Sequence, residues 1–213
     1  TASVWNGSEF SESPVRQTGE NQELLKIKTN DGCELKCTYY HKFKIASGYR
    51  NDKHIEVEAH QLKEGMNLIK CDFPTIDGDV NNDMDYPYTS GFYSGDGTNF
   101  YKKDGSRRYP IIDLYGKKQE LLQHLNYIRK NKYNEEYDRL RIVLNNDIED
   151  KFYVPNTNSS LRCKLNWLAG FIDADGSLTN NMGTVCIHIT SIHKDFLLKI
   201  KLLCNTLGCN PKI

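Results

Sequence analysis

The chain has 213 residues, and its 28 Lys and Arg balance 28 Asp and Glu. A hydrophobic content of 38%, with 13 Tyr and 8 Phe, can bury a core, so disorder is not expected. No apolar run approaches bilayer-spanning length, and residues 1–7 do not resemble a signal peptide. Seven Cys without a C-x-x-C pair favour reduced thiols over disulfides or zinc. We therefore expect a soluble protein without membrane partners, in a reducing intracellular compartment such as cytoplasm or nucleus.

Residues 1–71 are predicted to be rich in β-structure. Strands are expected over 25–29, 34–38, 42–45 and 55–57. The first two alternate apolar and polar residues and flank Asn30-Asp31-Gly32, a strong hairpin-turn signal. A Cys-Thr-x-x-His sequence containing Thr38 and His41 follows the hairpin. A lone His in such a place is more often structural than catalytic.

Charge is unevenly distributed along the chain. Residues 72–97 hold six acids and no Lys or Arg, whereas residues 101–141 hold eleven Lys or Arg against six Asp or Glu. Such a basic stretch suits phosphate contacts with nucleic acid, and it is also typical of a solvated helix face. The acidic segment 72–87 is predicted to be a linker.

Two halves with a similar order of elements are predicted next. The first half, 88–150, is expected to contain a helix, strands near 99–103 and 109–115, an amphipathic helix over 117–130 and a strand over 139–144. Residues 151–165 are expected to link the halves. The second half, 166–213, is expected to contain a helix, strands near Leu178 and 185–189, and a helix over 194–207 that buries Phe196, Leu197, Ile200 and Leu203.

Each half opens with a version of one unusual motif. The motifs are TSGFYSGDG at 89–97 and LAGFIDADG at 168–176, and each has small residues four apart, then an acid, then glycine. Residues four apart share one face of a helix, so two such helices can pack very closely. Asp96 and Asp175 would then lie side by side where both helices end. Gly97 and Gly176 suit the left-handed turn that ends a helix.

Two adjacent carboxylates at the negative ends of helices repel each other. A hard divalent cation, most naturally Mg²⁺ with oxygen ligands and waters, would neutralise them. Metal ions between carboxylates and a phosphate are a common means of cleaving a phosphodiester. The alternative is a pair of core helices whose acids face solvent. The duplicated order of small residues, acid and glycine favours the metal site.

The paired motifs resemble those of LAGLIDADG homing endonucleases. The second departs from that string only at Phe171, and in the first Ser94 stands where the family often has an acid. The resemblance implies an α+β fold in which pseudo-twofold αββαββα repeats, the second incomplete here, straddle double-stranded DNA as a monomer. It also implies hydrolysis of both DNA strands. Metal ligands are implied at Asp96 and Asp175, with the carbonyls of Gly97 and Gly176 assisting.

The same resemblance implies a basic residue near the site and base-reading side chains on a sheet. Lys151 is the candidate basic residue, the alternative being an ordinary surface lysine. The DNA-binding candidates in the first half are Asn99, Tyr101, Lys103, Arg107 and Arg108. Arg107 and Arg108 are alternatively phosphate-contacting loop residues.

The order of hairpin, Thr-x-x-His, strand and Ala-x-x-Leu-x-x-Gly resembles the Hint fold of inteins. The resemblance implies that Thr38 and His41 assist the acyl shift at the upstream splice junction, since imidazole can protonate a departing amide near neutral pH. The partner there would be the host extein polypeptide in cis. Residues 1–71 would be a partial all-β Hint domain, most similar to those of inteins in ribonucleotide reductase large subunits.

No Cys or Ser that resembles the first residue of an intein precedes Val4, and the sequence holds no His-Asn pair for the downstream junction. We therefore expect a fragment that does not splice alone. Three functions compete: an intein-borne homing endonuclease, a splicing element with a decayed endonuclease, and a non-catalytic LAGLIDADG DNA-binding module. Ser94 permits the second, whereas retention of Asp96 and Asp175 favours the first.

Overall fold

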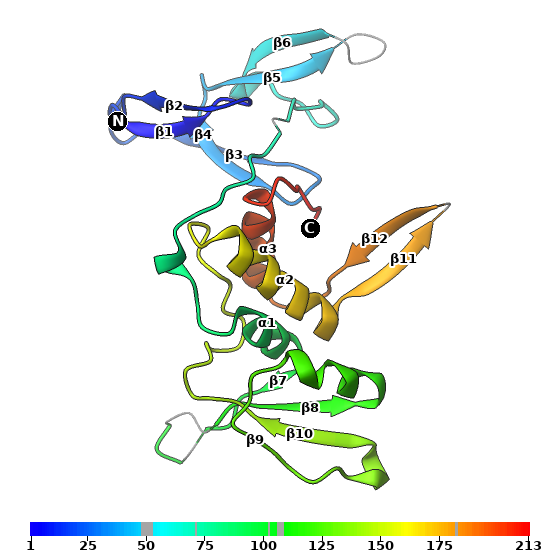
Figure 1. Cartoon of the computed structure of the whole chain (residues 1–213). Coiled ribbons are helices and arrows are strands. Elements are labelled where there is room, and N and C mark those ends of the chain that lie inside the picture. Colours follow the sequence, from blue (N-terminus) through cyan, green and yellow to red (C-terminus); the bar gives the residue numbers. More distant parts are fainter. Residues whose placement is uncertain (48–52, 71, 102, 106–108, 182) are drawn as a thin grey trace. The chain divides into compact units, whose positions relative to one another are not determined.

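A computed structural model describes residues 1–47, 53–70, 72–101, 103–105, 109–181 and 183–213. The chain mixes helices and strands and divides into two compact units (Figure 1). One unit comprises Thr1–Pro74 together with Gly208–Ile213, and the other comprises Thr75–Leu207. The expected α+β composition is therefore confirmed. The predicted candidates Arg107 and Arg108 lie outside the described residues.

The first unit is built from antiparallel strand pairs. The pairs are β1 (Ala2–Trp5) with β2 (Phe10–Ser13), β3 (Leu24–Lys28) with β4 (Glu34–Thr38), and β5 (Lys42–Ser47) with β6 (Lys53–Glu58). A short 3-10 helix, η1 (Ala59–Gln61), follows. The predicted hairpin turn between β3 and β4 is confirmed, with Gly32 at φ +83°, where a side chain would be strained.

This unit buries few apolar side chains. Among its described residues, those that are buried and apolar are Cys37, Ile45 and Ala59. The Asp31 side chain is 4% exposed and its carboxylate accepts from Lys70 Nζ at 2.7 Å. Trp5 also donates its indole N–H to the carbonyl of Asp72 at 2.7 Å. Polar contacts therefore supply much of the tertiary structure of the described part of this unit.

The described residues of the second unit form three α-helices and two sheets. The helices are α1 (Pro87–Asp96), α2 (Leu161–Asp175) and α3 (Lys194–Asn205). An antiparallel sheet has the order β7 (Gly97–Thr98), β8 (Ile111–Tyr115), β10 (Arg139–Val143), β9 (Arg129–Lys130). A separate hairpin pairs β11 (Ser177–Asn181) with β12 (Thr184–His188). Short 3-10 segments occur at η2 (Val80–Asn82), η3 (Gly116–His124) and η4 (Glu135–Tyr137).

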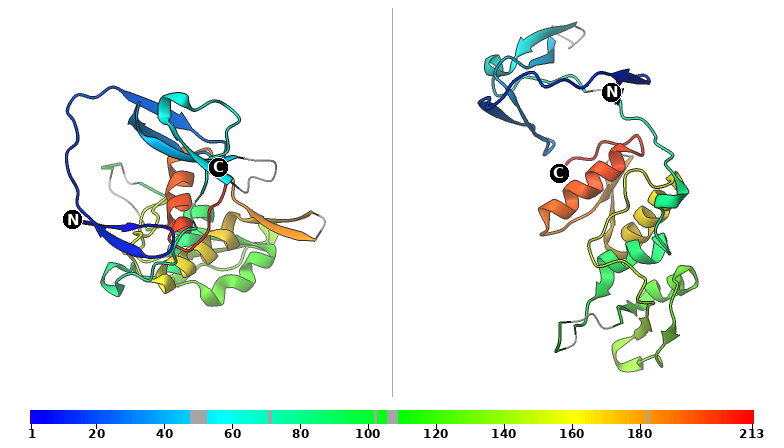
Figure 2. Two further views of the ribbon diagram at one scale, coloured as in Figure 1. Left: turned by 90° about the horizontal axis from the view of Figure 1, so that it is seen from above. Right: turned by 90° about the vertical axis from the view of Figure 1, so that its left-hand side faces the viewer.

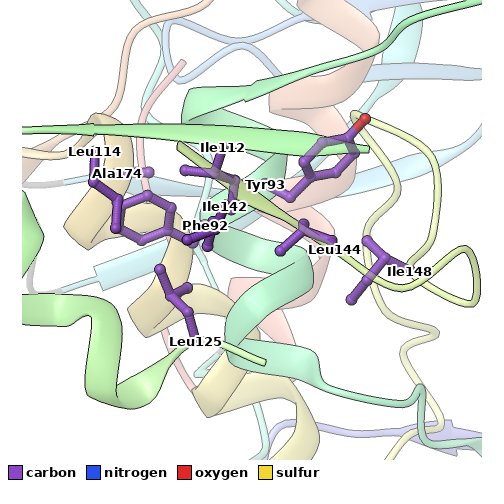
Figure 3. Close-up of a cluster of buried hydrophobic side chains, with 9 residues drawn as sticks. All are labelled: Phe92, Tyr93, Ile112, Leu114, Leu125, Ile142, Leu144, Ile148 and Ala174. Atoms are coloured by element: carbon purple, nitrogen blue, oxygen red, sulfur yellow. The ribbon is translucent and has the colours of Figure 1, made fainter. Parts of the chain in front are cut away.

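Helix α2 lies between α1 and α3 within this unit (Figures 1 and 2). One core joins α1 to the β8–β10 face and comprises Phe92, Tyr93, Ile112, Leu114, Leu125, Ile142, Leu144, Ile148 and Ala174 (Figure 3). A second core joins α2 to α3 and comprises Trp167, Phe171, Phe196, Ile200 and Leu203. The buried stripe predicted for α3 is confirmed at three of its four positions, Leu197 being partly exposed.

The expected helix over 117–130 is wrong. The segment forms η3, which ends at His124, and the chain then extends into β9. The reason is tertiary: Ile128 donates its N–H to the carbonyl of Val143 at 2.9 Å, and β9 pairs with β10. Leu125 is buried in the first core although Ile128 is 55% exposed. Pairing with the sheet has overridden the helical periodicity.

Two other expected elements differ in position. The strand expected over 99–103 is not formed in the described residues, because β7 ends at Thr98. Helix α2 begins at Leu161, inside the segment that was expected to link the halves. Ser160 caps it by accepting from Cys163 N at 3.1 Å, a contact typical of an N-cap serine.

Candidate catalytic site

Helices α1 and α2 pack against each other through their small residues, as the paired motifs predict. A Cβ atom on Gly91 would lie 1.9 Å from the carbonyl oxygen of Trp167, and one on Gly170 would lie 2.0 Å from that of Tyr88. Such distances exclude any side chain at either glycine. The two contacts are reciprocal, since each glycine faces the backbone of the other helix. The motifs therefore form the close interface between α1 and α2.

This interface brings Asp96 and Asp175 together at the ends of their helices. The Asp175 carboxyl carbon lies 3.1 Å from the position that a Cβ on Gly95 would take, directly before Asp96. Burial raises the pKa of Asp96, and the nearby Asp175 carboxylate raises it further, while Lys118 and Lys151 oppose the shift. Asp175 itself is exposed. The two acids thus differ in environment although the motifs match.

Lys118 binds Asp96 of the acid pair and was not predicted. Its Nζ donates to Asp96 Oδ2 at 2.5 Å and to the carbonyl oxygen of Ala174 at 2.6 Å. Lys118 belongs to η3, whose first residue is Gly116 at φ +50°. In the sequence it is one of eleven basic residues in a mixed-charge stretch. No local signal distinguished it, because its contacts come from residues 22 and 56 positions away.

Lys151 lies against the same helix end. Its Nζ donates to the carbonyl oxygens of Gly95 at 2.9 Å and Gly97 at 2.7 Å. Burial lowers the pKa of Lys151, whereas the charges of Asp175 and Asp96 act in the opposite direction. The candidate basic residue is therefore placed beside the acid pair rather than on an open surface.

The residue after Lys151 has an unusual backbone. Phe152 has φ +71°, a conformation that is costly for a bulky side chain. Its ring packs against Phe196 and His193, with centroids 5.1 and 4.5 Å away. The aromatic contacts hold this turn, so that the preceding lysine lies at the end of α1.

The motif glycines do not adopt the expected left-handed turn. Gly97 has φ −72° and Gly176 has φ −73°, both in extended conformation. Glycine is needed there for space. A Cβ on Gly97 would lie 2.3 Å from the carbonyl oxygen of Tyr93, and one on Gly176 would lie 2.5 Å from that of Ile172. The Gly97 carbonyl also accepts from Lys151, whose ammonium would repel a metal ion bound at this oxygen.

The penultimate acidic position of the motif differs between the halves. Asp173 accepts from the hydroxyl of Tyr88 at 2.7 Å, which ties α2 to α1. Ser94 at the matching place is buried and donates to the carbonyl of Ser90 at 3.0 Å. Asp173 thus makes a contact between the helices.

The predicted DNA-binding residues of the first half are dispersed. Asn99 accepts a short hydrogen bond from the Tyr93 hydroxyl, while Tyr101 and Lys103 are exposed in the loop after β7. The sheet face opposite the first core instead presents Arg139 and Arg141 of β10, because Leu140 and Ile142 point into that core. These arginines were missed, although strand alternation alone predicts their shared face.

Arg141 is held rigidly on this sheet face. Its Nε and Nη2 donate to the two carboxylate oxygens of Asp113, each at 2.7 Å, across the β8–β10 pair. Asp113 raises the pKa of Arg141. A bidentate pair of this kind fixes the guanidinium plane.

The acid pair has the oxygen donors that a hard divalent cation requires. Asp96 and Asp175 supply carboxylates at adjoining helix ends, which suits Mg²⁺. Within the described ranges, no cluster of three or more His, Cys, Asp or Glu is suited to hold a metal. A magnesium site with only two protein carboxylates is still possible, because magnesium usually retains several waters. Water or phosphate oxygens would fill its remaining coordination positions.

Thr38 and His41 lie in the first unit, at the end of β4. His41 donates its backbone N–H to the carbonyl of Thr38 at 3.1 Å, and its own carbonyl accepts from Ala59 N at 2.8 Å. The exposed imidazole packs edge-on to Phe43, with centroids 5.1 Å apart. A backbone hydrogen bond therefore closes the turn that carries both residues.

Residues 162–213, which include the acid of the second motif, match the family model described as a LAGLIDADG-like domain. The resemblance of the second motif to this family is thereby confirmed. Across 99% of its length the chain is also 42% identical to the ribonucleoside-diphosphate reductase large subunit of Invertebrate iridescent virus 6. It is 23% identical, over 92% of its length, to ribonucleoside-diphosphate reductase NrdEB subunit alpha of Bacillus subtilis (strain 168) and to its counterpart in Bacillus phage SPbeta.

The chain spans about a fifth of the length of these relatives, 22% of the viral protein and 20% of each bacillus or phage protein. Together, the family match and the relatives support an intein-encoded LAGLIDADG endonuclease in a ribonucleotide reductase context. In the described part of the chain, no helix has the length and apolar character to cross a membrane.

Proposed function

We propose that this chain is part of an intein-encoded homing endonuclease that hydrolyses both strands of a DNA duplex. The observation that carries the proposal is the α1–α2 interface, whose glycines bring Asp96 and Asp175 to one place. The LAGLIDADG-like match over residues 162–213 and the reductase relatives support it. The substrate would be a long duplex site of the host gene.

Asp96 and Asp175 would hold Mg²⁺ in this function. When bound, the cation would supply charge stabilisation and water activation for phosphodiester hydrolysis. Lys151, placed at the end of α1, would contribute positive charge next to the scissile phosphate. The sheet that carries Arg139 and Arg141 would contact the DNA. Asn99, Tyr101 and Lys103, which follow strand β7 of the same sheet, would contribute to this contact.

The test measures cleavage of a DNA duplex that represents the host gene without the intein-coding insertion. In this duplex the two host sequences that flank the insertion are joined directly. The chain would be expressed with its flanking coding sequence and assayed with and without Mg²⁺. Asp175→Asn is expected to reduce cleavage by about 10²-fold or more, since it removes a charge that acts in the transition state. Asp173→Asn, two residues earlier and also on α2, is the matched control and should retain cleavage. Cleavage retained in Asp175→Asn would refute the role of Asp175, and no cleavage by wild type with Mg²⁺ would refute the nuclease.

The first unit is proposed to be part of the splicing domain. Thr38 and His41 share one turn after β4, and the imidazole is exposed. In the longer protein, His41→Ala should therefore block peptide-bond cleavage or splicing at the upstream junction. The size of the host protein on a denaturing gel measures this. His54→Ala, an exposed histidine on β6, is the control and should splice normally. Normal splicing of His41→Ala would contradict the Hint assignment without affecting the nuclease proposal.

A further inference from the structure

The acid pair of the second unit already has a cation in contact with it. Lys118 Nζ lies 2.5 Å from Asp96 Oδ2, a close ion pair of opposite charges. The same ammonium donates to the carbonyl oxygen of Ala174 at 2.6 Å, one residue before Asp175. A single side chain therefore joins the ends of α1 and α2 at the place where the two acids meet.

The contact between Lys118 and Asp96 is partly shielded from solvent. The side chain of Asp96 is 24% exposed and that of Lys118 is 38% exposed. A pair in this setting is screened less than one on an open surface. Asp175, by contrast, is exposed. The cation of Lys118 is thus directed to the more buried acid.

The local charges balance without any added ion. Two carboxylates, Asp96 and Asp175, lie near two ammonium groups, those of Lys118 and Lys151. The two lysines also occupy the carbonyls of Gly95, Gly97 and Ala174. A divalent cation entering this arrangement would add two positive charges and would have to compete for Asp96 Oδ2.

We propose that Lys118 is a tethered counter-cation of the acid pair, which occupies Asp96 Oδ2 and competes with a divalent cation for it. The consequence is weak binding of divalent cations in the absence of DNA. A phosphate of bound DNA adds negative charge and restores the balance for the cation. This inference rests on the proposed function, since it takes Asp96 and Asp175 as the cation ligands.

The experiment measures Mn²⁺ binding to the full 213-residue chain by electron paramagnetic resonance of the free ion, without DNA. Lys118→Gln removes the charge and keeps a donor for the Ala174 carbonyl. Removing one positive charge about 4 Å from a divalent ion is expected to tighten binding by about tenfold. Lys118→Arg keeps the charge and should bind Mn²⁺ as weakly as wild type.

Lys117→Gln is the matched control, because Lys117 is the exposed neighbour with the same charge. It should leave the Mn²⁺ affinity unchanged. The double variant Lys118→Gln/Asp96→Asn should lose the gain, which assigns the gain to the Asp96 carboxylate. Circular dichroism checks that each variant is folded, and Lys118→Met repeats the comparison if the Gln variant is not.

Three results would overturn the inference: unchanged or weaker Mn²⁺ binding in Lys118→Gln, an equal gain in Lys117→Gln, or a gain that persists in the double variant. Absence of Asp96-dependent binding in every variant would overturn it as well. DNA cleavage is not part of this readout. A chain that shows the expected gain but never cuts its duplex would therefore contradict the proposed nuclease while leaving the role of Lys118 intact.

Discussion

Gly91 on α1 lies so close to the carbonyl oxygen of Trp167 on α2 that a Cβ atom would fall 1.9 Å from it. This contact involves two backbones, neither of which can rotate away as a side chain can. The approach of the helices therefore depends on glycine at this position, and so does the distance between the acids at their ends. The four predictions below test how this unit is held together and what its charged groups do.

Gly91→Ala is expected to destabilise the second unit by about 3 kcal/mol. Alanine improves helix propensity by about 1 kcal/mol, but overlap with the Trp167 carbonyl outweighs that gain. Chemical denaturation followed by circular dichroism measures the change. Ala169→Ser, which adds one atom on the exposed side of α2, is the control and should be nearly neutral. Wild-type stability of Gly91→Ala would mean that the helices do not approach so closely.

Asp96→Asn is expected to stabilise the chain at neutral pH. Because burial, and then the charge of Asp175, raise the pKa of Asp96, ionisation of this carboxyl costs stability. The favourable contribution of the protonated acid is complete below its unfolded pKa of about 3.8 and is lost as pH rises through the folded pKa. The variant should therefore melt about 1–2 °C above wild type at pH 7, after allowance for solvent screening.

The difference in melting temperature between Asp96→Asn and wild type should shrink towards zero below about pH 4. There the Asp96 carboxyl of wild type becomes protonated and is neutral, as the Asn side chain is. Thermal scans at several pH values between 3 and 8 measure it. Asp85→Asn, at an exposed acid before α1, is the control and should show no such trend. A variant less stable than wild type at pH 7 would show that the Lys118 contact outweighs the cost of burial.

Lys164→Met is expected to destabilise the second unit by about 2–3 kcal/mol. The side chain of Lys164 is fully buried, and its Nζ donates to the Ile76 carbonyl at 2.6 Å and to the Thr157 carbonyl and Thr206 Oγ1 at 3.2 Å each. Methionine fills similar space but leaves these acceptors without their donor. Urea denaturation measures the loss, with the exposed Lys199→Met as control. A neutral result would show that water replaces the ammonium at little cost.

Arg139→Ala is expected to weaken DNA binding without changing the fold. Arg139 lies on the sheet face opposite the first core and over the Tyr137 ring at 5.9 Å. If it contacts a phosphate, its loss should reduce the slope of log affinity against log salt by about 1. Fluorescence anisotropy at several salt concentrations measures the slope. Arg16→Ala, an exposed arginine of the first unit, should leave it unchanged, and an unchanged slope in Arg139→Ala would remove the sheet face from the interface.

The local elements of this chain were largely predictable from its residues. The β3–β4 hairpin follows from alternation around Asn30-Asp31-Gly32, and the apolar side of α3 follows from its 3.6-residue period. The pairing of α1 with α2 was also predictable, because small residues four apart define one helix face and occur twice. These features depend on periodicity, which a sequence displays directly.

The contacts of the charged groups were decided by tertiary structure. Lys118, Lys151 and Lys164 look alike in the sequence, yet one binds Asp96, one caps the end of α1, and one is fully buried. Each has a partner between 22 and 88 residues away, so spacing along the chain carries little signal for these contacts. The extended Gly97 illustrates the same limit, because its need for glycine comes from the nearness of Tyr93 and not from a left-handed turn.

The sequence by itself therefore determined that two matching helices meet and that each ends in an acid, since residue spacing fixes the face of a helix. Only the tertiary structure decided which cations face those acids and how deeply each acid is buried. The physical reason is that electrostatic partners are chosen by proximity in space, and proximity arises from the packing of α1, α2 and η3 together.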